Sequence, residues 1–316
     1  MTNGRDCGKL AGMSLPHIAL AFLVVAVWGT NFVVIKAGLA SFPPFLFALL
    51  RFFFSALPFV FLLPRPRTPW RWLALYGTFL GAGQFGLLFY AMRADISPGL
   101  ASLVVQAQVF FTIALSVWIF RERLTAPTIV GSLVAASGLA LIASRLDASA
   151  TPAGIVEVLG AAFGWSCANI VVKKAHAQAR GGFGMLAFVA WASLFAVPPL
   201  ALMSLALEGP HAIARSIGGA GLGAWTALAW QVLGNTLFGF AAWSFLLARY
   251  HAAAVSPYAL LVPVFGMGSS ALLLGEPLPA WKLAGGALVL GGIAMIVLLG
   301  TRRPPPGESG GASKAS

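Results

Sequence analysis

Charged residues are scarce in this sequence. They make up 9% of the 316 residues, whereas a typical soluble domain carries about 25%. Hydrophobic residues make up 59%, and the mean hydropathy is +0.89. The apolar runs are long and continuous, which excludes the alternating strands of about ten residues that a membrane barrel requires. The composition therefore excludes a soluble globular protein and predicts a polytopic helical membrane protein.

Acidic residues are especially few. The chain has eight Asp and Glu residues, and only Glu157 falls clearly inside an expected span. A carboxylate within the membrane is the usual site for a proton or a cation, so this shortage argues against a carboxylate-driven exporter of cationic drugs. We interpret Glu157 as a side chain that reaches the outer surface, with a functional role as the alternative.

Cysteine and histidine are also rare, with two and four residues. Cys7 lies in a polar leader and Cys167 in an apolar span, so there is no disulfide framework and no metal-ligand spacing. No histidine has a serine, cysteine or acid at helical spacing, and we therefore expect no enzyme, catalytic residue, metal or cofactor. The pattern G-x-G-x-x-G at Gly81 to Gly86 lies within a span rather than between a strand and a helix, which favours helix packing over nucleotide binding.

What the chain does contain is ten apolar segments, each long enough to cross a membrane. Short connections rich in Pro and Gly separate them. The segments run approximately over 17–38, 44–63, 71–92, 97–120, 127–144, 153–174, 183–206, 221–247, 253–274 and 280–300. We expect residues 1–16 to form a tail before the first span, and residues 301–316, rich in Pro, Gly and Ser, to be a disordered tail.

The positive charges predict an orientation. The formal net charge is +12, but the basic residues fall between apolar spans, so they indicate topology and no nucleic-acid partner. Of the 20 Lys and Arg residues, about 14 fall on the side that the N-terminus shares with alternate connections. Because cytoplasmic loops collect Lys and Arg, we expect both termini to be cytoplasmic.

Two stretches of the chain repeat each other. Residues Trp28 to Lys36 contain an aromatic residue, an asparagine, branched aliphatics and a lysine, and the same order returns at Trp165 to Lys174. From Glu122 and Glu276 onward the two halves match at an offset of 154 residues. Five spans per half is an odd number, so the second copy must be inverted. We predict an all-α membrane protein with ten transmembrane helices in two inverted five-helix repeats, 17–148 and 149–300, a common build for transporters.

Amides inside the spans are the best candidates for a substrate path. An unpaired amide in hydrocarbon costs several kcal/mol, so each must face another helix or a wet cavity. Asn31 and Asn169 occupy matching places, and Trp28 and Trp165 share their helix faces. The alternative is hydrogen bonding between helices. If both asparagines line a path, Asn31→Leu and Asn169→Leu should lower transport with little loss of stability.

Arg51 lies about seven residues into the second span. Two interpretations stay open: it holds a substrate carboxylate, or it snorkels or pairs with backbone carbonyls at a packing position. Glu122 and Glu276 lie at span ends, where we expect them to cap helices or pair locally. Pro257 and Pro263 should allow the ninth span to bend.

The segments below resemble a known family. The chain is similar to the EamA-like branch of the drug/metabolite transporter superfamily over roughly residues 17–300. It looks most like the exporters of cysteine and O-acetylserine, and more loosely like exporters of aromatic amino acids. The resemblance is carried by Val27–Lys36, Leu50–Phe52, Gly99–Gln108, Arg121–Leu124, Leu260–Val264 and Leu274–Glu276.

The resemblance implies a central cavity surrounded by the first, third, fourth, sixth, eighth and ninth spans. The second half departs from the first in two respects: Pro263 stands where the first half has Gln108, and no charge matches Arg51. A symmetric site is therefore in doubt. The positions that the resemblance places in the cavity are Trp28, Asn31, Gln84, Gln106, Trp165, Asn169, Asn235 and Tyr258.

The sequence thus predicts a bacterial inner-membrane exporter of amino acids and related small metabolites, with broad specificity, that works by alternating access. Its partners would be the small-molecule substrate and membrane lipid, and a homo-oligomer is left open. A multidrug exporter of lipophilic compounds is the alternative, because aromatic walls also suit such molecules. A translocator of phosphate esters should carry paired Lys or Arg inside the spans, where only Arg51 qualifies.

Overall fold

The computed structural model describes residues 13–121, 124–145, 149–179, 184–250 and 252–299. The predicted tail 301–316, most of the predicted tail 1–16, and Glu122 lie outside the described residues. The described chain is almost entirely helical, and within it one isolated bridge joins Ile96 to Ala150.

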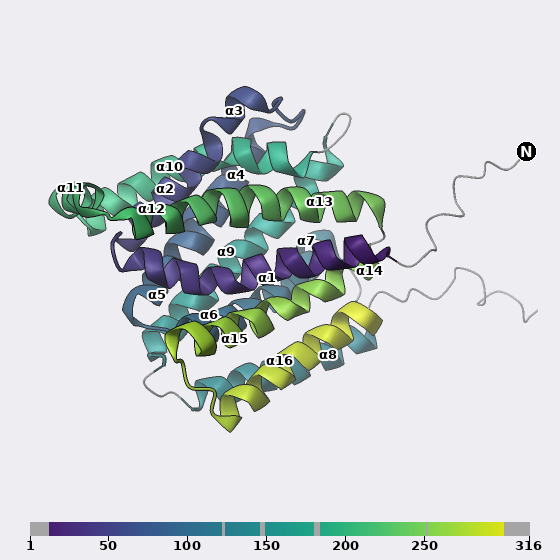
Figure 1. The fold of residues 1–316 in the computed structure, drawn as a ribbon. Coiled ribbons are helices and arrows are strands. Elements are labelled where there is room, and N and C mark those ends of the chain that lie inside the picture. Colours follow the sequence, from purple (N-terminus) through teal and green to yellow (C-terminus); the bar gives the residue numbers. More distant parts are fainter. Residues whose placement is uncertain (1–12, 122–123, 146–148, 180–183, 251, 300–316) are drawn as a thin grey trace, which may run out of the picture.

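The first half contains five helical stretches, and they cross the bundle back and forth (Figure 1). Their elements are α1 (Leu15–Leu39), α2 (Pro44–Ala56) with α3 (Phe59–Leu62), α4 (Trp70–Thr78) continuing through η2 (Phe79–Gly86) into α5 (Leu87–Ala94), α6 (Pro98–Val104) continuing through η3 (Val105–Ala107) into α7 (Gln108–Phe120), and α8 (Ala126–Ala143).

The second half has the same order, with one added surface helix. Its elements are α9 (Pro152–Ala177), α10 (Met185–Leu207), the added α11 (Pro210–Gly219), α12 (Leu222–Ala229) continuing through η4 (Trp230–Phe238) into α13 (Gly239–Arg249), α14 (Ala252–Val255) continuing through η5 (Ser256–Leu261) into α15 (Val262–Leu274), and α16 (Ala280–Leu299).

The ten predicted spans are confirmed with edges shifted by a few residues. Among the described residues, nine helices are long and apolar enough to cross a membrane. The tenth is the continuous helix of α12, η4 and α13, in which amides such as Gln231 and Asn235 lower the hydropathy. Several starts are set locally: proline opens α2, α6 and α9, where a missing N–H costs nothing. Thr151 also caps α9 by accepting a hydrogen bond from the Gly154 amide at 3.0 Å.

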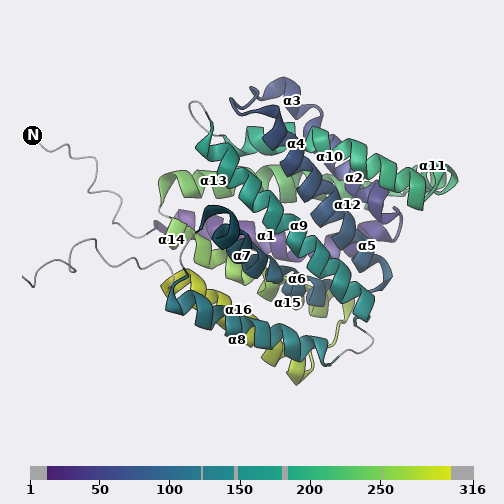
Figure 2. The same ribbon diagram turned by 180° about the vertical axis from the view of Figure 1, so that it is seen from behind.

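The helix ends define two sides of the bundle. In Figure 1, α1 begins and α16 ends at the right, which we call the terminal side. The added helix α11 lies at the opposite end, where α1 ends and α2 begins, and we call this the far side. Seen from behind, α9 runs across the bundle between these two sides (Figure 2).

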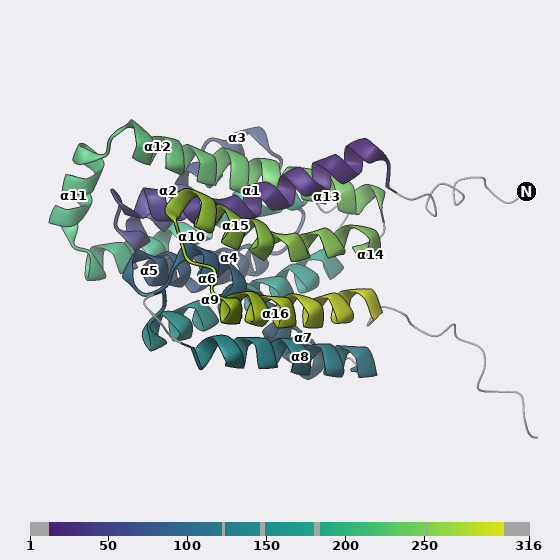
Figure 3. The ribbon, with the colours of Figure 1, turned by 60° about the horizontal axis from the view of Figure 1, so that its bottom comes forward.

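Helices α8 and α16 pack side by side at one edge of the bundle (Figure 3). A Cβ on Gly131 would lie 2.6 Å from the carbonyl oxygen of Gly292, and a Cβ on Gly138 would lie 2.7 Å from that of Gly285. Gly285 and Gly292 are the repeat equivalents of Gly131 and Gly138. Gly131 therefore faces the repeat equivalent of Gly138, and Gly138 faces the repeat equivalent of Gly131. A two-fold axis between the two helices produces this pattern. The contact confirms the inverted repeat.

A matched pair of glycines tests this contact. Gly292→Ala would place a methyl group 2.6 Å from the Cβ of Ala135 and against the Gly131 backbone, so α8 and α16 must separate. We expect a loss of about 2 kcal/mol in unfolding free energy. Gly291→Ala is the control because that position faces open space. Thermal unfolding in detergent measures both variants, and equal melting temperatures would contradict the close approach.

A second structural match lies at the end of each half. Arg121 ends α7 with φ at 54°, and Gly275 ends α15 with φ at 68°. The two residues stand at the repeat offset, and both adopt the left-handed conformation that glycine favours. The repeat thus preserves the turn even where the residue type differs.

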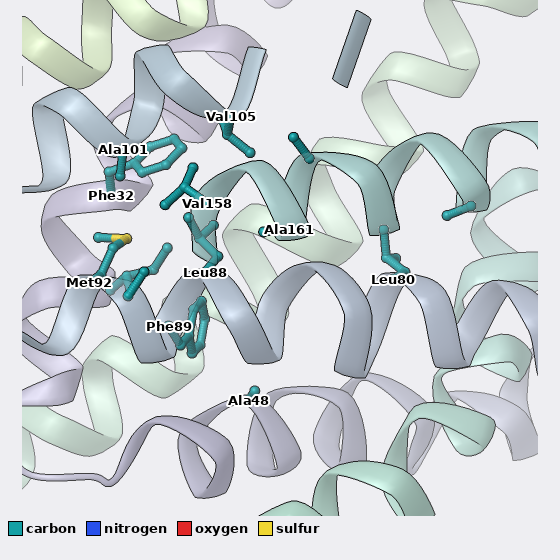
Figure 4. Packing of buried hydrophobic residues seen from close by; sticks show 14 of the residues in the cluster. Phe32, Ala48, Leu80, Leu88, Phe89, Met92, Ala101, Val105, Val158 and Ala161 are labelled. Carbon is teal, nitrogen blue, oxygen red and sulfur yellow. The ribbon is translucent and has the colours of Figure 1, made fainter. Parts of the chain in front are cut away.

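Part of the hydrophobic core lies in the far half. Figure 4 shows Phe32 of α1 near Ala101 of α6, with Val158 of α9 and Leu88 and Met92 of α5 beside them. All five side chains are at least 93% enclosed. Each of these helices contributes the part that is closest to the far side, so buried apolar side chains fill the bundle there.

Candidate functional site

Four helices lose regular α-geometry, and they do so in matching pairs. The third and eighth spans contain π-helical segments, η2 and η4, and these hold Gln84 and Asn235. The fourth and ninth spans contain 3₁₀ segments, η3 and η5, which hold Gln106 and Tyr258. Such segments within helices are frequent at functional sites. The distortions lie near the middle of the third, fourth and eighth spans and in the first part of the ninth.

A buried hydrogen-bond network ties three helices together in the far half. The Gln231 amide nitrogen donates to Asn31 Oδ1 at 2.7 Å, and Gln231 Oε1 accepts from Arg51 Nη1 at 2.9 Å. Arg51 Nη2 also donates to Thr236 Oγ1 at 3.2 Å. We call these four residues the far network. It joins α1, α2 and η4, and all four side chains are buried.

Arg51 is the only cation in the far network. Its side chain is 1% exposed, so it does not snorkel, and its two hydrogen bonds go to side chains rather than to backbone carbonyls. The guanidinium carbon lies 3.7 Å from the centroid of the Phe85 ring, a cation–π contact. Among the described residues no carboxylate pairs with it, and its Nε has no hydrogen-bond partner.

A second network lies closer to the terminal side. Asn169 Nδ2 donates to Gln108 Oε1 at 3.1 Å and to Thr112 Oγ1 at 3.3 Å. The Ser166 hydroxyl donates to the backbone oxygen of Gln108 at 2.8 Å. We call these four residues the terminal network. It joins α9 to α7, and its amides are only half-buried.

The two asparagines therefore have matching positions but different partners. Asn169 bonds to Gln108 of the fourth span, whereas Asn31 bonds to Gln231 of the eighth. Pro263 stands where the repeat would place the counterpart of Gln108, and proline offers no side-chain acceptor. Asn31 consequently pairs with a different helix, which gives the asymmetry expected from the sequence a physical cause.

Aromatic residues lie beside the far network, where α1 contacts η4 and α13. Trp28 Nε1 donates to the backbone oxygen of Asn235 at 3.1 Å. Its ring lies 5.2 Å from that of Trp243 and 5.9 Å from that of Phe240, centroid to centroid. Tyr258 of η5 contacts Phe22 of α1, with ring centroids 5.4 Å apart.

The eight predicted positions thus fall into separate groups. Trp28, Asn31 and Asn235 lie together at the contact of α1 with η4, whereas Asn169 belongs to the terminal network. Trp165 is half-buried against the hydrophobic core. Gln84 and Gln106 are buried, and Gln84 Oε1 has no hydrogen-bond partner.

Gln231 and Gln108, the amides at the centre of the two networks, are buried-amide candidates in the sequence but are not among the positions that the resemblance places in the cavity. A signal for Gln231 existed, because it stands four residues before Asn235 and one helical turn places both on the same face. For Gln108 the signal was its place in the repeat, where the second half has a proline.

Two surface pockets lie away from these residues. One, of about 390 Å³, lies on the far side beside Arg93 and Arg215. Another, of about 700 Å³, lies on the terminal side beside Arg65, Arg67 and Gln178. In the described part of the chain, no three His, Cys, Asp or Glu side chains lie close enough together to hold a metal ion.

Glu276 forms a structural clamp, as expected from its place at a span end. It accepts hydrogen bonds from the Ser97 and Ser270 hydroxyls and from the Gly99 amide, and it pairs with Lys282 at 3.0 Å. Burial by itself would raise the pKa of Glu276, but these hydrogen bonds outweigh burial and hold the pKa below its usual value of 4.5. The carboxylate caps α6 and neutralises a lysine that is fully enclosed.

Glu276→Gln should therefore destabilise the protein by about 2 kcal/mol at pH 7. Because the folded-state pKa is lowered, the wild-type advantage is complete above about pH 4.5 and disappears as the pH falls through the folded-state value. Glu157→Gln is the control, since the buried Oε2 of Glu157 has no hydrogen-bond partner to lose. Melting temperatures at pH 7, 5 and 4 measure the difference, and a loss that does not change with pH would contradict this role.

The fold and the two networks define a class of protein. A multi-pass helical bundle of two inverted repeats, with paired distortions within its helices and amides near them, is the architecture of a secondary transporter. The family model of the EamA-like transporter family matches residues 15–144 and again 152–298. The chain belongs to the EamA-like transporter family.

Relatives of known sequence match nearly the whole chain. A "Probable amino-acid metabolite efflux pump" of Salmonella typhimurium is 42% identical over 276 residues, 87% of this chain and 92% of the relative. The protein with the same description in Escherichia coli is 38% identical over 283 residues, 89% of this chain and 94% of the relative. A solved crystal structure aligns with a TM-score of 0.60 at 18% identity, covering 91% of this chain and 98% of the other, which supports the fold alone.

Proposed function

We propose that this protein exports amino acids and related small metabolites, with broad specificity, by alternating access. The observation that carries the proposal is the identity of 42% to an efflux pump of that description over nearly the full length of both chains. The family model matches both repeats, over residues 15–144 and 152–298, and so includes every helix that contributes to the two networks.

The burial of the helices supports an alternating mechanism. Every residue of α6 and η3, in the far half of the fourth span, is buried, whereas Ser116 is the one buried residue of α7 in the other half. The ninth span has the same asymmetry, because no residue of η5 is buried while α15 has five buried residues. We propose that the structure represents the state that is closed toward the far side. Rocking of the two halves would then open the far side and close the terminal side.

The amides suit a zwitterionic substrate. Asn and Gln side chains can donate to a carboxylate and accept from an ammonium group. The half-buried Asn169 and Gln108 would meet a substrate that enters from the terminal side. A site with few fixed charges discriminates weakly between side chains, which accounts for broad specificity.

The distribution of Lys and Arg supports a membrane location and an orientation for the protein. With the excess of Lys and Arg on the terminal side, that side would face the cytoplasm of a bacterial inner membrane, and the far side would face outward. Export then runs from the terminal network to the far network. The protein would be a transporter rather than an enzyme, with repeats at 17–148 and 149–300.

One observation favours a second candidate function. The rings of Trp28, Phe240 and Trp243 form an aromatic cluster next to the far network. Such a wall also suits lipophilic compounds, so a multidrug exporter is the competing proposal.

Uptake of labelled amino acids into proteoliposomes decides between the candidates. The panel includes cysteine, O-acetylserine and an aromatic amino acid, with a lipophilic cation and a sugar phosphate as controls. We expect several amino acids to be transported and the sugar phosphate to be excluded. Transport of the cation without any amino acid would contradict the proposal.

A further inference from the structure

Arg51 has a charge and hydrogen-bond donors that the rest of the protein does not satisfy. A guanidinium has five N–H donors, and Arg51 uses two of them, both toward neutral oxygens. Placing an ion in a protein interior costs several kcal/mol unless an opposite charge compensates it. No carboxylate of the described residues does so here. An ionisable residue held inside the membrane in this way marks a functional position.

The atoms around Arg51 point to a particular ligand. Its unused Nε–H lies beside the Nη groups, and together they form the fork that binds a carboxylate with two hydrogen bonds. Ser55 stands one helical turn further along α2, on the same face, and its hydroxyl has no partner. The guanidinium stacks on the ring of Phe85, and Gln84, the residue before it in η2, is buried and has an unpartnered Oε1 that could accept from an ammonium group.

We infer that Arg51 binds the α-carboxylate of the exported amino acid and selects for substrates that carry one. This inference rests on the proposed function and adds the group that makes a substrate acceptable. Arg51 is enclosed in this structure, so the carboxylate reaches it only when the far half loosens. The substrate would then replace the neutral oxygens of Gln231 and Thr236.

This exchange would connect binding to movement. The bonds of Arg51 to Gln231 and Thr236 hold α2 against η4 and so keep the far side closed. A carboxylate that takes over the guanidinium releases α2 from η4. The substrate thereby favours the open state, as differential binding to one of two conformations requires.

Carboxyl-modified competitors test the inference. For one amino acid that the wild type transports, inhibition by the unlabelled amino acid is compared with inhibition by its methyl ester and its carboxamide, which keep the ammonium group and the side chain. We expect both modified compounds to inhibit at least about tenfold more weakly, or about 1.4 kcal/mol. In Arg51→Gln this ratio should fall below about threefold, while Arg93→Gln, a matched change at an exposed arginine, should keep the wild-type ratio.

The outcomes separate the two proposals. A wild type that transports no amino acid contradicts the proposed function. A wild type that transports amino acids but is inhibited equally by the ester and the carboxamide overturns the role of Arg51 alone. If Arg51→Gln does not fold, Arg51→Lys replaces it, and we expect a reduced ratio because lysine lacks the planar fork. A folded variant of Arg51 with the wild-type ratio also overturns the inference, since a purely structural arginine would change protein yield and stability but not this ratio.

Discussion

Gln231→Leu is expected to lower the unfolding free energy by about 3 kcal/mol or more. Gln231 accepts from Arg51 Nη1 and donates to Asn31 Oδ1, so leucine would remove the partner of both of these buried atoms. An unsatisfied buried polar group costs about 1–3 kcal/mol, and a charged one costs more. Thermal unfolding in detergent measures the loss. A melting temperature equal to that of the wild type would show that the far network does not stabilise the closed state.

Gln231→Glu tests the same contact by strengthening it instead of removing it. The new carboxylate would stand where Oε1 now accepts from Arg51 at 2.9 Å, and Asn31 can turn its amide to donate instead of accepting. The buried charge would then be compensated inside the protein. We expect this variant to be at least as stable as the wild type but to transport about tenfold more slowly, because α2 is held to η4 more strongly. Normal transport by Gln231→Glu would argue against opening at this contact.

Asn169→Leu is expected to have the largest effect on transport relative to its effect on stability. The variant removes two hydrogen bonds to α7, yet Gln108 Oε1 keeps the bond from the Thr112 hydroxyl at 3.4 Å. Little stability is therefore lost, whereas a polar group on the proposed path disappears. We expect amino-acid transport to fall at least about tenfold with a change of under about 1 kcal/mol in stability. Initial transport rates and melting temperatures of the same preparation measure both.

Asn31→Leu serves as the comparison from the other half of the repeat. It leaves the enclosed Gln231 Nε2 without its acceptor, so a stability loss of about 1–3 kcal/mol should accompany the loss of transport. The structure thus changes the expectation that both asparagine variants stay equally stable. A strongly destabilised Asn169→Leu, or a fully stable Asn31→Leu, would contradict the assignment of the two networks.

Much of the architecture could be predicted from the sequence. Long apolar runs fix the spans because the length of a helix must match the thickness of the membrane. The inversion followed from an odd number of spans per repeat, and the packing of Gly131 against Gly292 reflects it. The role of Glu276 at a helix end was also predictable, since a lone acid at a span boundary has few alternatives.

The partners of the polar groups could not be predicted. Hydropathy does not tell which face of η4 meets α1 and α2, so Gln231 could not be identified as the link between Asn31 and Arg51. The π-helical segments leave no mark in the hydrophobic pattern. For Arg51 the sequence left two interpretations open, and only its complete burial excludes snorkelling.

Solute counterflow tests the central claim, that this chain carries amino acids by exposing one site to each side in turn. Proteoliposomes are loaded with an unlabelled amino acid, and a trace of the labelled amino acid is added outside, so no assumption about energy coupling is needed. We predict a transient accumulation of label above its equilibrium level with the wild type and a strongly reduced one with Gln231→Glu. Label that merely equilibrates, without exceeding the outside concentration, or that does not enter at all, would contradict the account.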